Sequence, residues 1–61
     1  MTLRDIKNAV KSGKTVYWMN RLHKVVCIEG QWIIKAFDGT KHLLAWADGT
    51  LNGEEKEFFT N

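Results

Sequence analysis

Two apolar, strand-length runs joined by Asp38-Gly39 are the feature that most constrains the fold of this chain. The first run covers residues 31–37 and the second covers residues 40–46. Asp and Gly tolerate the positive φ angles that a tight turn between antiparallel strands requires, so this pattern is a strong local signal for a β-hairpin. The sequence therefore predicts a hairpin over residues 31–46, and the remaining chain must pack around it.

The chain has 61 residues, which is near the lower limit for a domain that folds without crosslinks. Its one cysteine, Cys27, excludes an internal disulfide and a zinc site built on paired cysteines. The fold must therefore depend on a hydrophobic core, and 44% of the residues are apolar. No run approaches the roughly 18 apolar residues of a membrane span, and the first residues lack the apolar segment of a signal peptide. We expect a single cytoplasmic domain, residues 1–61, with no membrane partner.

The first residues predict a helix over about residues 2–12. Thr2 can cap the helix, and Asp5 can return a hydrogen bond as in a capping box. Gly13 is well placed to end the helix in a left-handed conformation. The apolar residues at helical spacing, which predict the buried face, are Leu3, Ile6, Ala9 and Val10.

After residue 14 the pattern changes to the two-residue alternation of β-strands. Strands are predicted at residues 15–19, 24–28, 31–37 and 40–46, with a short edge strand at residues 50–51. The turns between them fall at residues 20–23, 29–30, 38–39 and 48–49. Residues 54–61 form an acidic tail that contains Phe58 and Phe59.

Turn lengths set the strand registers and therefore decide which side chains share a face. We expect a four-residue turn at residues 20–23, which pairs Trp18 with Val25. We expect two-residue loops at residues 29–30 and 38–39, and the second of these pairs Ile34 with Leu43. One face then carries Val16, Trp18, Val25, Cys27, Trp32, Ile34, Leu43 and Ala45. A three-residue loop with a bulge at Gly39 is the alternative for the third turn, because one extra residue flips the next strand.

The predicted fold class is therefore α+β, with an N-terminal helix packed on a twisted antiparallel β-meander of four to five strands. The opposite face of this sheet would carry Tyr17, Met19, Val26, Ile28, Ile33, Lys35, Phe37, His42, Leu44 and Trp46. A solvated sheet face is mostly polar, and this one is not. Three explanations stay open: closure toward a small barrel, coverage by the tail through Leu51, Phe58 and Phe59, or an interface with another molecule.

The last explanation predicts a non-enzymatic protein-interaction module that binds an unidentified protein or associates with itself. Large contiguous apolar patches are uncommon on monomers and mark interaction sites. The candidate interface residues are Tyr17, Ile33, Phe37, Leu44 and Trp46.

Nucleic-acid binding is the alternative function, and it follows from the distribution of charge. Residues 1–24 carry six Lys and Arg against one Asp, whereas residues 25–61 carry three Lys against six Asp and Glu. A basic helix face beside exposed aromatic side chains suits a single strand, whose phosphates and bases need both. The candidate residues are Lys7, Lys11, Lys14 and Arg21. A solvated lysine-rich helix face is the competing interpretation.

Catalysis, metal binding and cofactor binding are not indicated. His23 and His42 lie on different predicted elements without companions at metal-ligand spacing, and Cys27 falls on the predicted buried face, where a thiol is inert. There is no phosphate-binding loop, and the chain is short for a substrate pocket of the usual size. We therefore expect no enzymatic activity, no metal, no cofactor and no small-molecule substrate.

Two stretches give the chain a family resemblance. The first is carried by Leu3, Ile6, Lys7, Ala9, Val10, Gly13, Lys14, Val16 and Trp18, and the second is Asp-Gly-Thr-Leu-Asn-Gly at residues 48–53, followed by acids and Phe58-Phe59. Together they resemble small proteins of bacterial phages and plasmids that have no assigned activity. The resemblance covers most of the chain and implies a mobile-element accessory protein that binds host or element macromolecules. It assigns no functional residue.

Overall fold

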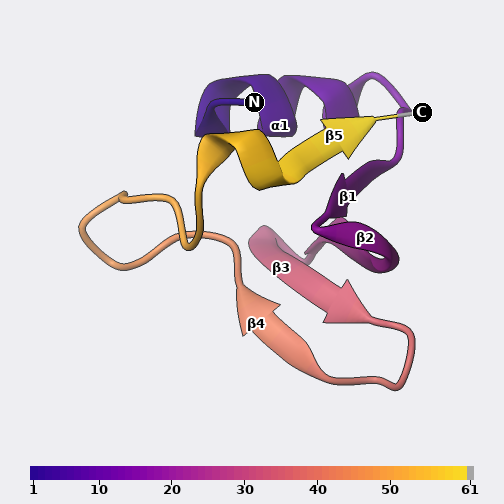
Figure 1. The fold of residues 1–61 in the computed structure, drawn as a ribbon. Coiled ribbons are helices and arrows are strands. Elements are labelled where there is room, and N and C mark those ends of the chain that lie inside the picture. The colour runs from indigo at the N-terminus through magenta and orange to yellow at the C-terminus, as the bar shows by residue number, and fades with distance from the viewer. Residues whose placement is uncertain (61) are drawn as a thin grey trace.

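The computed structural model describes residues 1–60 and has one α-helix packed on a five-stranded antiparallel sheet (Figure 1). The predicted α+β class is confirmed. Along the chain the elements are α1 (Leu3–Lys11), β1 (Val16–Trp18), β2 (Asn20–Ile28), β3 (Gln31–Ala36), β4 (Lys41–Leu43), a 3-10 helix η1 (Glu55–Glu57) and β5 (Phe58–Thr60). Within residues 1–60 the sheet is open, with the strand order β4-β3-β2-β1-β5, so closure into a barrel is not what covers its second face.

Helix α1 begins at the predicted capping box. The Thr2 hydroxyl accepts a hydrogen bond from the Asp5 N–H, and an Asp5 carboxylate oxygen accepts one from the Thr2 N–H, each at 3.1 Å. These two bonds satisfy N–H groups that the first helical turn leaves unpaired. Gly13, with φ of 91°, follows the helix in the left-handed region. The sequence signals at both ends of the helix are therefore confirmed.

The loop between β3 and β4 has three residues. The prediction of a two-residue loop, which would pair Ile34 with Leu43, is therefore wrong. The Ala36 N–H donates to the Thr40 carbonyl oxygen at 2.8 Å, and Gly39 has φ of 93°. Ile33 consequently pairs with Leu43, and Ile34 pairs with His42. The bulged alternative at Gly39 is the one that the chain adopts. Its extra residue flips β4, so Leu44 is fully buried and Leu43 is 55% exposed.

The register between β1 and β2 also differs from the prediction, whereas the register between β2 and β3 is confirmed by the pairing of Cys27 with Trp32. Tyr17 pairs with Lys24 and Trp18 pairs with Asn20. Residues 21–23 of β2 are therefore not paired with β1 and form a bulge, where a separate turn was predicted. The observed register differs from the predicted one by two residues, which keeps Val16 and Val25 on the same face.

The fifth strand is Phe58–Thr60, and not the predicted residues 50–51. It pairs with β1, whereas Leu51 only forms an isolated bridge with Ala45. The predicted tail therefore becomes an edge strand, next to the helix in Figure 1. The Met1 ammonium donates to the Glu55 carbonyl oxygen at 2.6 Å, which ties the first residue to η1.

The core lies between α1 and one face of the sheet. It consists of Ile6, Val16, Val25, Ile34, Leu44 and Phe58. Cys27, predicted to be buried on this face, is exposed, although it pairs with half-buried Trp32. The opposite face of the sheet, which carries no helix, is called the far face below. In the described part of the chain, no helix has the length and apolar character that crossing a membrane requires.

We predict that Leu44→Ala lowers the free energy of unfolding by about 2–5 kcal/mol, because it removes a fully buried side chain and leaves a cavity. Leu43→Ala is the matched control, since it alters an exposed neighbour and should cost no more than about 0.5 kcal/mol. Urea denaturation of both variants measures the two values. The opposite ranking would contradict the observed register of β4.

The β3–β4 loop has a second copy later in the chain. In both loops an Asp carboxylate accepts the backbone N–H of a Thr two residues on at 2.9 Å, from Thr40 to Asp38 and from Thr50 to Asp48. The bond to the Thr40 N–H lowers the pKa of Asp38 below its ordinary value, and the bond to the Thr50 N–H lowers the pKa of Asp48 in the same way. The ionised carboxylates therefore favour the folded loops.

A carboxylate whose pKa is lower in the folded chain stabilises the fold above its unfolded pKa of about 3.9, and this contribution is lost as the pH falls through the folded pKa. We predict that Asp38→Asn with Asp48→Asn lowers stability at neutral pH, because the amide oxygen can accept the same bond but lacks the charge that strengthens it. The double variant should lose less stability on acidification. Urea unfolding at neutral and at acid pH tests this, and an unchanged acid loss would refute it.

Candidate functional site

The strand registers align five side chains in one row across the far face. Phe59 on β5 pairs with Tyr17 on β1, Tyr17 pairs with Lys24 on β2, Lys24 pairs with Lys35 on β3, and Lys35 pairs with Lys41 on β4. Directly paired residues in a sheet point to the same side. The row therefore crosses the whole sheet, with two aromatic side chains at one end and three lysines at the other.

The local sequence explains why these lysines reach the far face. Val25 and Ile34 are buried against α1, so the alternation of a strand sends the adjacent Lys24 and Lys35 to the other side. Lys41 joins them because the three-residue loop sets the register of β4.

The lysine row, Lys24, Lys35 and Lys41, is not neutralised by the protein. Like charges placed directly opposite one another repel. Among residues 1–60, no side chain forms an ion pair or a hydrogen bond with any of these three ammonium groups. Among the described residues paired in the strands, none that shares this face is acidic. The row is therefore a concentrated positive charge over about 10 Å, given the strand spacing of about 4.8 Å.

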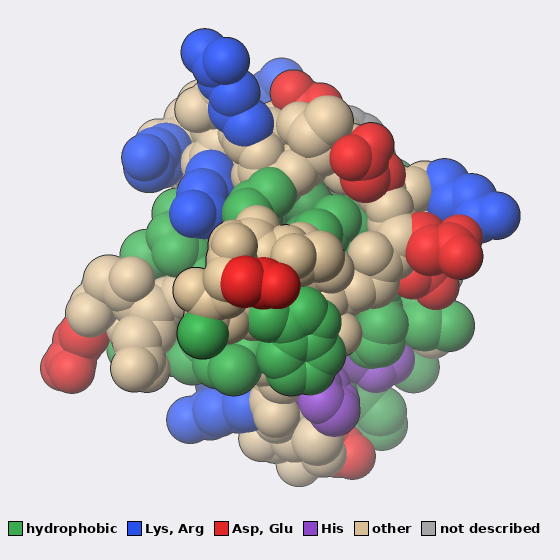
Figure 2. Space-filling view, turned by 90° about the vertical axis from the view of Figure 1, so that its left-hand side faces the viewer, with side chains coloured by type: hydrophobic (Ala, Val, Ile, Leu, Met, Phe, Trp, Pro, Cys, Tyr) green, Lys and Arg blue, Asp and Glu red, His purple; other side chains and the backbone are tan. Residues whose placement is uncertain are grey.

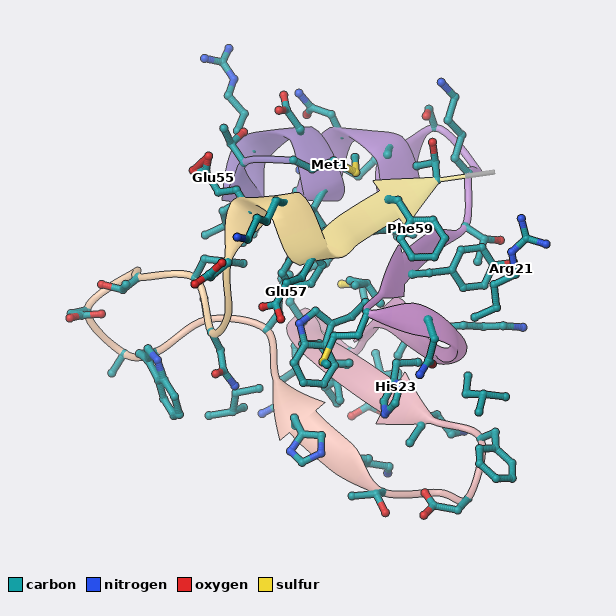
Figure 3. The ribbon with its side chains drawn as sticks, in the orientation of Figure 1. Met1, Arg21, His23, Glu55, Glu57 and Phe59 are labelled. Carbon is teal, nitrogen blue, oxygen red and sulfur yellow. The ribbon has the colours of Figure 1, made fainter. Side chains whose placement is uncertain are left out.

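The aromatic end of the row is a stack built on Tyr17. The rings of Tyr17 and Phe59 lie 5.4 Å apart between centroids, and the Arg21 guanidinium lies 6.0 Å from the centre of the Tyr17 ring. Arg21 and Phe59 lie toward the same side of the ribbon in Figure 3. Tyr17 itself is 9% exposed, so Phe59 and Arg21 are the members of the stack that a ligand can reach.

A shallow groove of about 450 Å³ opens beside this stack. It is lined by Arg21, Leu22, Lys24, Val26, Lys35, Ala36 and Phe37. Phe37 is 78% exposed, and its backbone N–H donates to the Leu22 carbonyl oxygen at 2.9 Å, which fixes the position of its backbone. The groove thus combines two lysines, a guanidinium, an exposed aromatic ring and apolar side chains.

A second row on the far face is apolar. Val26 pairs with Ile33, and Ile33 pairs with Leu43. Leu43 and nearby Ile28 are exposed, while Val26 and Ile33 are half-buried. The apolar second face predicted from the sequence is therefore present in part: Val26, Ile28 and Ile33 lie on it. His42 and Leu44, also predicted there, lie on the helix side, and Leu43 is on the far face instead.

The five predicted interface residues do not form one surface. Tyr17, Ile33 and Phe37 belong to the far face, as described above. Leu44 is fully buried under α1 and has no surface to offer a partner, because the β4 register is shifted by one residue. Trp46 is 53% exposed and lies after β4, where its backbone N–H donates to the Thr50 carbonyl oxygen at 2.8 Å.

The four predicted nucleic-acid residues are also divided. Lys7 and Lys11 line a depression on the helix surface together with Arg4, and the Lys7 ammonium lies 5.7 Å from the centre of the Trp32 ring. Lys14 follows the helix and lines a different depression. Basic side chains gather at the top of the molecule, over α1 (Figure 2). Arg21 alone reaches the far face, where it stacks on Tyr17.

Trp18 and both histidines form a further cluster, on the helix side of the sheet. The Trp18 ring lies 5.3 Å from the His23 ring and 6.2 Å from the His42 ring. His23 Nδ1 is 2.9 Å from Asn20 Oδ1, and the Trp18 Nε1–H is buried without a partner among the described residues. In residues 1–60 no three His, Cys, Asp or Glu side chains gather in a way that could hold a metal ion.

Lys24, Lys35 and Lys41 are the surface residues that the sequence reasoning did not place together. The signal that could have found them is the three-residue bulged loop between β3 and β4. That loop sets the register of β4 in which Lys41 pairs with Lys35, so all three lysines lie on one side of the sheet.

Comparison of the chain with protein-family models, with curated proteins and with solved structures finds no match.

We predict that Lys35→Gln stabilises the domain by about 0.2–0.5 kcal/mol at low salt, because it removes the central charge of three that repel one another. The gain should disappear at high salt, where the repulsion is screened. Thermal unfolding at two salt concentrations measures the effect. Lys11→Gln, a change on the exposed helix surface, is the control, and an equal gain there would show that the row carries no special repulsion.

Proposed function

We propose that this protein binds nucleic acid through the far face of its sheet, with the lysine row in contact with phosphates. The observation that carries the proposal is the alignment of Lys24, Lys35 and Lys41 across three neighbouring strands without an acidic partner in the described chain. Three opposed ammonium groups destabilise a sheet, and an anionic ligand that lies across the strands would relieve this repulsion.

A nucleic-acid backbone is well suited to this arrangement because it presents regularly spaced charges along a line. The lysines also lie along a line, perpendicular to the strands, and the line continues into Tyr17 and Phe59. Aromatic side chains next to cations are the combination with which sheet surfaces hold single strands. We prefer the far face to the helix surface predicted from the sequence, because among the described residues Lys7 is the one of the three helix lysines that lies over an aromatic ring, and that ring, Trp32, is half-buried.

We predict that a fluorescently labelled oligothymidylate of about eight nucleotides binds the protein at low salt, and that binding weakens as salt rises. Three phosphate contacts on a single strand give a slope of log K against log salt of about −2, from about −0.7 per contact. Replacing Lys24, Lys35 and Lys41 together with Gln should abolish binding. A fluorescence anisotropy titration measures both quantities.

The matched control replaces Lys7, Lys11 and Lys14 with Gln, which removes the same charge from the helix surface. This variant should keep most of the affinity, although the loss of net charge weakens long-range attraction slightly. Equal loss in both triple variants would show that net charge, and not the lysine row, governs binding. Absence of binding to the natural sequence at low salt would refute the proposal.

Protein binding is the second candidate, and one observation favours it. The apolar row of Val26, Ile33 and Leu43 is accessible on the far face, and exposed apolar groups of this kind suit a protein partner. A protein-binding surface would be indifferent to single-stranded DNA, so the same titration separates the two functions. Either activity would suit the mobile-element accessory role that the sequence resemblance implies.

A further inference from the structure

We propose that the groove beside the lysine row is a nucleobase subsite, which would make the domain selective for single-stranded over double-stranded nucleic acid. This inference rests on the proposed function and adds a ligand chemistry to it. The subsite is the groove lined by Arg21, Leu22, Lys24, Val26, Lys35, Ala36 and Phe37.

The groove has two planar groups on which a base can stack. The first is the Phe37 ring, which is 78% exposed although it is a large apolar side chain. The second is the Arg21 guanidinium, which lies 6.0 Å from the centre of the Tyr17 ring and belongs to a residue that lines the groove. Arg guanidinium planes and aromatic rings are the groups that stack on unpaired bases.

The remaining lining residues suit the other parts of a nucleotide. Leu22 and Val26 provide apolar contacts for the base, and Lys24 and Lys35 belong to the lysine row. A base in this groove therefore has cations beside it that can contact its own phosphate and the next one. The volume of about 450 Å³ is within the range of about 300–1,000 Å³ that small-molecule sites have.

A duplex cannot use this subsite without losing base pairs. Its bases are stacked and paired inside the helix, and their flat faces are not accessible to Phe37 or Arg21. The lysine row can contact duplex phosphates, but the groove adds affinity only for unpaired bases. The charge and stacking contributions therefore come from different residues and can be separated by substitution.

The experiment compares three ligands with equal numbers of phosphates: oligothymidylate, the corresponding abasic oligomer, and a duplex. Phe37→Ala should weaken oligothymidylate binding by at least about fivefold, the lower bound for one stacked base, and leave abasic binding unchanged. Arg21→Lys should act in the same way, because it keeps the charge but removes the planar group. Trp46→Ala is the control, since it removes another exposed aromatic ring outside the groove.

A second measurement guards against a variant that fails to fold. In the natural sequence, oligothymidylate should shift the backbone amide NMR signals of Ala36 and Phe37, and the abasic oligomer should shift them less.

Equal affinity of the natural sequence for oligothymidylate, the abasic oligomer and the duplex would overturn the nucleobase subsite while leaving phosphate binding intact. Absence of binding to all three would refute the proposed function itself, and equal binding of a polyglutamate peptide would indicate an acidic protein partner instead.

Discussion

The three-residue loop between β3 and β4 determines both the core and the far face of this protein. Its bulge at Gly39 fixes the register of β4, and that register has two consequences. On one side it buries Leu44 completely, beside Ile34 in the core. On the other side it brings Lys41 opposite Lys35 and completes the lysine row. Stability and the proposed binding surface therefore depend on the same local backbone geometry.

Local signals in the sequence predicted the parts of the fold that local physics decides. The capping box at Thr2 and Asp5, the left-handed Gly13 and the β2–β3 hairpin are all as expected, since each depends on residues close in sequence. The β3–β4 loop was harder because Asp-Gly fits both a two-residue turn and the αL position of a three-residue bulged loop. The hydrophobic pattern did not separate these alternatives, because Leu43 and Leu44 are adjacent and either one can fill the core.

The site was less predictable than the fold because it depends on registers across the whole sheet. No short motif contains Lys24, Lys35 and Lys41, and their alignment requires two strand pairings to be correct at the same time. The fifth strand was missed for a related reason. Residues 58–60 follow an acidic segment and pair with β1, far away in sequence, so only the finished sheet shows that Phe59 extends the row.

A simpler reason for the lysines is protection of an uncovered sheet face. One helix covers one face, and charged residues on the other face reduce aggregation through exposed apolar groups and sheet edges. Protection alone, however, does not require charges of one sign. A lysine–glutamate–lysine row would be equally polar, and its opposite charges would stabilise the sheet where the observed row destabilises it. The chain has acidic residues in its turns and in η1, yet none of them pairs with Lys24, Lys35 or Lys41 in the described strands. A row of one sign beside accessible Phe37 and Arg21 is better explained by a ligand that is both anionic and aromatic.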